Sequence, residues 1–296
     1  MVVLDPTLIG VTAGFMTLLG LGLAGILALA NRRLWVFEDP RIDEVESLLP
    51  ATNCGACGTA GCRPFAELLV KGEIEPAKCT VSSADAIEEI AEYLGVEAGE
   101  SLRRVARLAC AGGAHVARMQ AHYEGLESCR SAALIGGGPK RCAWGCLGFA
   151  DCERACDFDA ISMDHHGLPV VDTDRCTACG DCVAICPKDL FSLQPVTHRL
   201  WVACANLLHG DAAESECEVA CTGCEKCARD AAPGLIEIRD NLARVNYALN
   251  DLASPDAIQR CPTGAIVWLE EAGVRRGRKA RRIVRGEALP VEKVAL

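Results

Sequence analysis

The chain has 296 residues, of which 20 are cysteine, and its formal net charge at pH 7 is −10. This acidic balance argues against nucleic acid as a partner, because binding to DNA or RNA requires a basic surface. Aromatic residues make up only 4% of the chain, so large side chains alone cannot stabilise the two or three small domains that this length allows. So many cysteines indicate disulfides, metal ions or clusters, and their spacing must decide among them.

Residues 8–30 form a run of 23 uncharged, mostly apolar residues. As a helix this run would be about 34 Å long, enough to cross a bilayer core of about 30 Å. Arg32 and Arg33 follow it, while the residues before it carry only Asp5. By the positive-inside rule we predict a single-pass anchor over residues 1–33 in the inner (cytoplasmic) membrane, with the rest of the chain on the cytoplasmic side.

A cleaved signal peptide is the alternative for this segment, but it would need a basic leader and a shorter apolar core. If the cysteines face the reducing cytoplasm, metal ligation is favoured over disulfides.

The first group of cysteines has the spacing C-x2-C-x4-C-x16-C, formed by Cys54, Cys57, Cys62 and Cys79. Interleaved glycines let the backbone fold closely around a cluster and direct N–H groups at its sulfurs. A structural zinc ion is the alternative, although the second half lacks the paired C-x2-C of a zinc ribbon. Helical patterns at 43–50 and 82–95 flank the group. We predict a small helical 4Fe-4S domain over residues 34–100.

Residues 176–187, CTACGDCVAICP, match the ferredoxin run C-x2-C-x2-C-x3-C-P at every position. In such pairs the fourth cysteine of each run serves the other cluster, which predicts one set made of Cys156, Cys176, Cys179 and Cys182. The upstream run, residues 140–157, has Phe149 where a ligand is expected. We predict that an upstream cysteine replaces it, giving a second set of Cys142, Cys146, Cys152 and Cys186. A strand–turn–strand pattern at 160–172 completes a two-cluster ferredoxin-like module over residues 101–200.

An internal repeat follows this module. The segments WVAC (201–204) and CEVAC (217–221) resemble RLAC (107–110) and CAWGC (142–146) in order and type. The repeat predicts a second, degenerate ferredoxin-like module over residues 201–272, with one cluster on Cys221, Cys224, Cys227 and Cys261. Four cysteines are then left over, and they form either a fifth cluster or buried free thiols: Cys110, Cys129, Cys204 and Cys217. We therefore expect four or five 4Fe-4S clusters.

The C-terminal segment 273–296 is predicted to be a basic tail, because residues 275–285 hold seven basic residues and no acid. Such a tail either contacts an acidic partner or anionic lipid, or is a disordered solubilising end. The chain shows no Ser/His/Asp arrangement, paired catalytic carboxylates or dinucleotide fingerprint. We predict no catalytic residue in this chain itself.

The combination of motifs resembles one known family over nearly the whole chain. The anchor ending in Asn-Arg-Arg, the segment CGACGTAGCRPFAE (54–67), the segment KRCAWGCLGFADC (140–152) and the ferredoxin run are similar to the B subunit of the Rnf complex. The resemblance implies an α+β fold with an N-terminal transmembrane helix, a helical 4Fe-4S domain and tandem ferredoxin-like modules. Among the ligands it implies are Cys54, Cys57, Cys62 and Cys79 and the two ferredoxin sets.

The same resemblance implies the function of an iron–sulfur subunit in a membrane-bound ferredoxin:NAD⁺ oxidoreductase that translocates Na⁺ or H⁺. Its partners would be soluble ferredoxin, the membrane and the other Rnf subunits. The chain departs from long family members with a complete second cluster pair, which leaves the number of clusters open. The alternatives are an iron–sulfur subunit of another membrane oxidoreductase, which has no reason to carry the first motif, and a zinc-binding structural protein.

Overall fold

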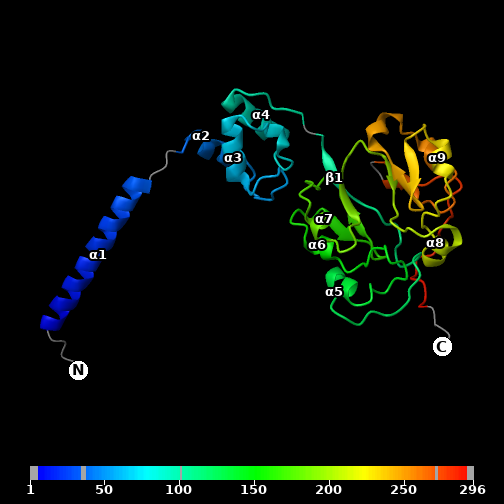
Figure 1. Ribbon diagram of the computed structural model, residues 1–296, viewed down its shortest axis with the longest axis horizontal. Coiled ribbons are helices and arrows are strands. Elements are labelled where there is room, and N and C mark those ends of the chain that lie inside the picture. The colour runs from blue at the N-terminus through cyan, green and yellow to red at the C-terminus, as the bar shows by residue number, and fades with distance from the viewer. Residues whose placement is uncertain (1–5, 35–37, 101, 271–272, 292–296) are drawn as a thin grey trace.

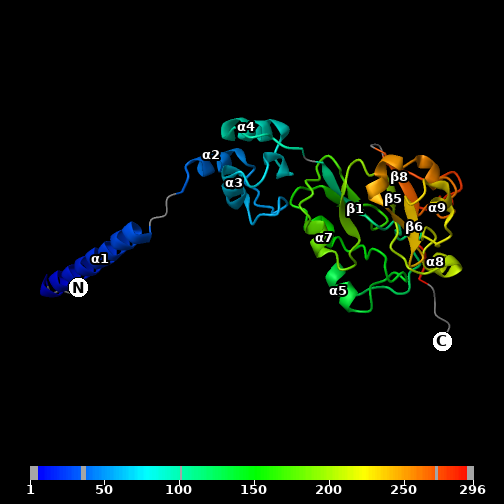
Figure 2. The ribbon, with the colours of Figure 1, turned by 45° about the horizontal axis from the view of Figure 1, so that its top comes forward.

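The computed structural model describes residues 6–34, 38–100, 102–270 and 273–291. Along the chain these residues form a long helix, a small helical domain and two mixed modules that lie side by side (Figures 1 and 2). The predicted mixed α+β class is confirmed.

The N-terminal helix α1 spans Pro6–Leu34 and ends with Arg32 and Arg33 in its last turn. Its stretch Gly10–Leu34 has a mean hydropathy of 2.0 and buries nothing against the rest of the described chain. A helix that is apolar all round needs a lipid or protein environment. By length and composition α1 is able to cross a membrane.

The small helical domain contains α2 (Arg41–Leu48), α3 (Cys62–Lys71), the 3-10 helix η1 (Pro76–Lys78) and α4 (Ala84–Leu94). The two helices expected near 43–50 and 82–95 are therefore confirmed as α2 and α4. Its core consists of buried aliphatic and aromatic side chains from three helices, chiefly Val45, Phe65, Leu69 and Ile90. This core is small, so the cysteine loops beside it must carry part of the stability.

The first module pairs β1 (Arg104–Leu108) with β4 (Phe191–Pro195), and β2 (Ile161–Met163) with β3 (Pro169–Val171), all antiparallel. The short helices α5 (Cys129–Leu134), α6 (Asp151–Arg154) and α7 (Asp181–Ile185) carry cysteines or follow them. The strand–turn–strand expected at 160–172 is confirmed by β2 and β3. Two strand pairs and a short helix after each cysteine run are the layout that the ferredoxin pattern predicts.

The second module repeats this plan with one half altered. Strands β5 (Leu200–Val202), β8 (Ile266–Glu270) and β9 (Gly273–Arg275) form one sheet, and β6 (Ile236–Arg239) pairs with β7 (Leu242–Val245). Helices α8 (Gly210–Glu216) and α9 (Lys226–Asp230) complete the intact half. Two 3-10 helices, η2 (Tyr247–Leu252) and η3 (Pro255–Ile258), occupy the half that keeps Cys261 but lacks the other cysteines. Buried Ile258 fills that side of the core.

The two modules share a core of their own. It combines Val116 and Ala117 of the first module with Ala213 and Val219 of the second. Backbone hydrogen bonds also cross the boundary, from Arg118 N to Glu216 O at 2.9 Å and from Glu218 N to Val116 O at 3.0 Å. The modules are therefore packed against each other as well as tethered.

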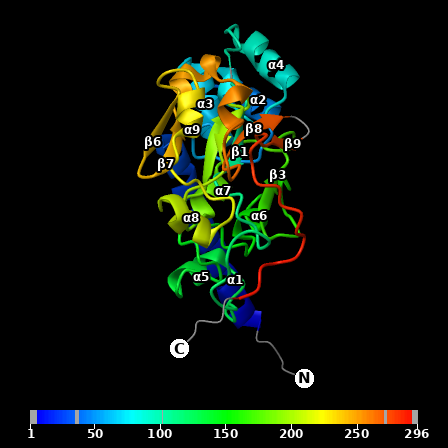
Figure 3. The same ribbon diagram turned by 90° about the vertical axis from the view of Figure 1, so that its right-hand side faces the viewer.

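The C-terminal segment, predicted as a basic tail, packs against the rest of the protein. Residues 273–275 belong to strand β9, and residues 276–291, the C-terminal strap, run from there along both modules (Figure 3). Gly277 lies so close to the carbonyl of Ile258 that a Cβ would overlap it. Ile283 packs on the core between the modules, and Leu289 N donates to Ala114 O at 2.9 Å. The last five residues of the predicted tail lie outside the described residues.

Candidate iron–sulfur centres

All twenty cysteines fall into five sets of four, and each set lines its own pocket. The pockets have empty volumes between 300 and 350 Å³, including space open to solvent. Four sulfurs arranged around a void are the donor set that a 4Fe-4S cluster requires.

The first set consists of Cys54, Cys57, Cys62 and Cys79 in the helical domain. The side chain of Asn53 accepts a hydrogen bond from the N–H of Cys62 at 2.8 Å, at the point where α3 begins. The hydroxyl of Ser82 donates to the Cys79 sulfur at 3.1 Å, and the Thr59 hydroxyl lies 3.1 Å from the Cys57 sulfur. The structure thus brings together the four residues that the sequence spacing grouped.

The ferredoxin run also places its cysteines as expected. Cys176, Cys179 and Cys182 share a pocket with Cys156, which comes from the other half of the module. The N–H groups of Ala106 and Ala160 each lie 3.4 Å from a sulfur of this set. Strand β1 therefore supplies a donor to a site that is formed largely by residues 70 positions further along the chain.

The second set of the first module corrects the sequence-based grouping. Its pocket is lined by Cys129, Cys146, Cys152 and Cys186, and Cys142 is not among the lining residues. Cys129 begins the short helix α5, whose first turn is held by hydrogen bonds from Ser128 and Arg130 to the carboxylate of Asp151. This contact brings α5 to the start of α6, so Cys129 reaches the position that Phe149 leaves without a thiol.

The second module contributes one set within its own core, formed by Cys221, Cys224, Cys227 and Cys261. Three of the four are buried, and aliphatic side chains surround them. This grouping agrees with the one expected from the repeat.

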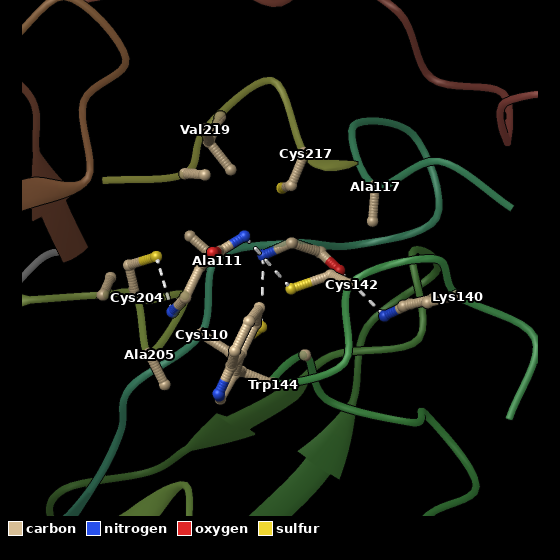
Figure 4. A pocket seen from close by; sticks show the side chains of 15 residues that line it. Cys110, Ala111, Ala117, Lys140, Cys142, Trp144, Cys204, Ala205, Cys217 and Val219 are labelled. Carbon is tan, nitrogen blue, oxygen red and sulfur yellow. Dashed lines mark hydrogen bonds between the residues drawn. The ribbon is translucent and has the colours of Figure 1, made fainter. Parts of the chain in front are cut away.

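The fifth set lies between the modules and is lined by Cys110, Cys142, Cys204 and Cys217 (Figure 4). The expected fifth group had Cys129 in place of Cys142, so the structure exchanges these two residues. Each module contributes two cysteines to this set, and the two pairs occupy equivalent positions of the repeat. Cys110 and Cys204 follow the first strands, while Cys142 and Cys217 open the two C-x3-C segments.

The hydrogen bonds of this interface set repeat in the same way. The Cys110 sulfur accepts from Gly112 N and Cys146 N at 3.4 Å each. The Cys204 sulfur accepts from Asn206 N at 3.4 Å and from Cys221 N at 3.2 Å. The two-fold arrangement follows from the internal repeat. The shared pocket and the N–H groups directed at the sulfurs are what a common ligand site requires.

Burial raises the pKa of several of these thiols to about 12, and the neighbouring cysteines act in the same direction; they are Cys146, Cys152, Cys182, Cys204, Cys217 and Cys227. Such groups stay protonated at neutral pH unless a cation compensates the thiolate charge. Bound iron would supply that charge and displace the protons.

The donor sets fit clusters better than single ions. Among the described residues, no group of three or more His, Cys, Asp or Glu side chains is arranged to hold one metal ion. A zinc site draws its four sulfurs to about 2.3 Å from a single centre, whereas here the cysteines of each set surround a pocket. The fold and these sets define an iron–sulfur protein of the ferredoxin type.

Comparison with known proteins agrees with this class. Two family models match the chain: one described as "Putative Fe-S cluster" over residues 49–81, and a 4Fe-4S binding domain over residues 168–191. A relative from Acetobacterium woodii, the B subunit of a Na⁺-translocating ferredoxin:NAD⁺ oxidoreductase complex, is 36% identical over 258 residues, covering 87% of this chain and 76% of the relative.

The B subunit of the proton-translocating counterpart from Clostridium ljungdahlii is 39% identical over 253 residues, 85% of this chain and 89% of the relative. The B subunit of an ion-translocating oxidoreductase complex from Methanosarcina acetivorans is 34% identical over 248 residues, 84% of this chain and 94% of the relative. The chain belongs to this family, the B subunits of Rnf complexes, as its motifs predicted. Together with helix α1, this membership indicates association with a membrane.

Proposed function

We propose that this chain is the iron–sulfur electron-transfer subunit of a membrane-bound, ion-translocating ferredoxin:NAD⁺ oxidoreductase. It would accept electrons from soluble ferredoxin and relay them to other subunits of the complex. One observation carries the proposal: all twenty cysteines are distributed over five four-cysteine pockets in three adjoining structural units. The clusters supply one-electron chemistry, while the protein binds them, limits solvent access and directs N–H groups at their sulfurs.

The proposal includes five 4Fe-4S clusters rather than four. Iron and sulfide analysis of the full-length protein should give about twenty of each per chain, with EPR signals after reduction. About sixteen would mean that the interface set consists of free thiols. Zinc without sulfide, in a colourless protein, would overturn the proposed function.

We further propose that the iron–sulfur domains face the cytoplasm. Arg32 and Arg33 lie in the last turn of α1, and such residues concentrate on the cytoplasmic side of a single span. The Cys54 set follows α1 most closely in the chain, so it is suited to pass electrons to partners at the membrane.

The C-terminal strap is the surface we propose for the approach of ferredoxin. Three of the seven basic residues at 275–285 form ion pairs: Arg275 with Glu270, Arg281 with Glu214 and Arg285 with Glu218. The other four are exposed and form no ion pair with a described residue: Arg276, Arg278, Lys279 and Arg282.

The strap that carries these four cations passes the pocket of the second module's set. Lys279 N donates to Gln259 O at 3.0 Å and Arg281 N to Pro262 O at 2.8 Å, so the strap runs past Cys261, a member of the second module's set. A positive patch on an otherwise acidic protein attracts an acidic carrier and raises its association rate.

Reversing two of these charges should slow reduction by ferredoxin. We expect Arg278→Glu/Lys279→Glu to lower the second-order rate about tenfold at low salt, with the difference shrinking as salt screens the charges. The matched control is Lys71→Glu/Lys78→Glu, which makes the same charge change on exposed residues of the helical domain. Stopped-flow reduction at several ionic strengths measures both. Equal rates in the two variants would refute docking at the strap.

A further inference from the structure

The pocket of the interface set contains a buried positive charge. Lys140 lines this pocket, and only 4% of its surface is exposed. Its ammonium donates to the carbonyl of Gly112 at 2.8 Å, and no carboxylate among the described residues forms an ion pair with it. A buried ammonium without a counter-ion is strongly unfavourable. Four thiolates around a cluster would supply negative charge in the pocket that Lys140 lines, and would compensate its ammonium.

Lys140 breaks the two-fold symmetry of the site. The equivalent position in the second repeat, two residues before Cys217, is Ser215, whose hydroxyl bonds to its own helix at Ala212 O. Gly112, whose carbonyl accepts the hydrogen bond from Lys140, donates its own N–H to the Cys110 sulfur at 3.4 Å. Cys146 N donates to the same sulfur at 3.4 Å, which links the interface set to one member of the Cys129 set.

Asn206 is the second asymmetric feature. It is 1% exposed, and its amide nitrogen lies 3.6 Å from the Cys142 sulfur. Its amide oxygen accepts from Leu208 N at 2.7 Å, which holds the NH₂ group toward the sulfur. The equivalent residue of the first repeat is Gly112, which has no side chain to do this.

The interface set is also well supplied with N–H donors. Five N–H groups lie within 3.2–3.6 Å of three of its sulfurs. In the Cys156 set, Ala106 N and Ala160 N lie 3.4 Å from sulfurs. Hydrogen bonds to sulfur and nearby positive charge both stabilise the reduced cluster, which carries one more negative charge.

We propose that the interface cluster has the highest reduction potential of the five, and that Lys140 is its built-in counter-ion. This inference rests on the proposed function, because it requires clusters in these sites. The fixed ammonium of Lys140 would offset the charge that one electron adds at the interface set, so no proton would have to move. The interface centre would then retain an electron between the modules until the next acceptor is oxidised.

Redox titrations of the full-length protein test the proposal. The interface signal is identified as the component missing from Cys217→Ala. In Lys140→Met the midpoint potential of this signal should fall by at least 59 mV, which corresponds to a tenfold change in the equilibrium constant for one-electron reduction. Lys140→Arg, which keeps the charge, should leave the midpoint close to that of the unmodified protein. The midpoint of the Cys129 set should fall less, and the other three should not move.

A second variant still tests the proposal if Lys140→Met fails to bind the interface cluster. Asn206→Leu removes one N–H donor without touching the charge, and it should lower the same midpoint by a smaller amount. The inference is overturned if the interface midpoint is not the highest of the five, or if it stays unchanged in the variants that keep their iron. Iron and sulfide content of the unmodified protein tests the proposed function independently. Failure of the proposed function can therefore be distinguished from failure of the inference about Lys140.

Discussion

Replacing Cys142 and Cys217 together by alanine is expected to remove one cluster, about four iron atoms per chain. Both residues line the interface pocket, so the double variant takes two ligands from a single set and leaves the other four sets complete. The grouping predicted from sequence spacing would instead place these residues in two different sets. Iron analysis combined with EPR counts the centres that remain.

A second double variant, which removes one cysteine from each of two sets, is expected to affect two clusters instead of one. Cys129→Ala/Cys217→Ala takes one ligand from each of two pockets, so two of the five cluster signals should be lost or altered. If this variant changes one centre and Cys142→Ala/Cys217→Ala changes two, the assignment drawn from the structure is wrong. The pair is matched in residue type and number, so general destabilisation cannot produce the contrast.

The internal repeat contained the signal that local spacing missed. Aligning CAWGC with CEVAC makes Cys142 equivalent to Cys217 and Phe149 equivalent to Cys224. The second module completes its set without Cys217, so its counterpart Cys142 was equally free for another site. Spacing within the ferredoxin run alone favours Cys142, the nearest cysteine, as the replacement for Phe149. Equivalence between the repeats instead assigns Cys142 to the interface set.

The replacement for Phe149 could not be read from spacing. Cys129 lies in the segment 111–141, where α5 is the one helix among the described residues. It reaches its set because Asp151 accepts hydrogen bonds from Ser128 and Arg130, a contact across more than twenty residues that no local pattern encodes. The regular cysteine runs, by contrast, fix their own geometry through tight turns, and their sets follow directly from the sequence.

The C-terminal strap shows that the charge pattern of a segment does not predict whether the segment is ordered. The run of seven basic residues without an acid at 275–285, six of them in the strap, is typical of a disordered end. Here the acidic partners of Arg281 and Arg285 lie far away in the chain, on and beside α8, and a close contact at Gly277 holds the backbone to the second module. Composition therefore gave the charge of the segment correctly, but its order depends on tertiary contacts.

Phe65→Ala should destabilise the helical domain by about 3–5 kcal/mol, the usual loss for a large aromatic residue removed from a core. Phe65 is 1% exposed, lies on α3 next to Cys62 and lines the pocket of the first set. A core this small leaves little reserve within the 5–15 kcal/mol typical of whole domains. We expect loss of the Cys54-set cluster, about four iron atoms, with the other four clusters retained.

Phe149→Ala is the matched control for this variant. Phe149 is half-buried, and its ring lies 5.0 Å from that of Tyr123, centroid to centroid. Its loss should lower stability by roughly 1–2 kcal/mol and leave the iron count unchanged, because Cys129 supplies the ligand at this site. Iron content, chemical denaturation and limited proteolysis compare the two variants. Since α3 positions both Cys62 and the core, retention of all clusters in Phe65→Ala would show that the first site is held by its loops alone.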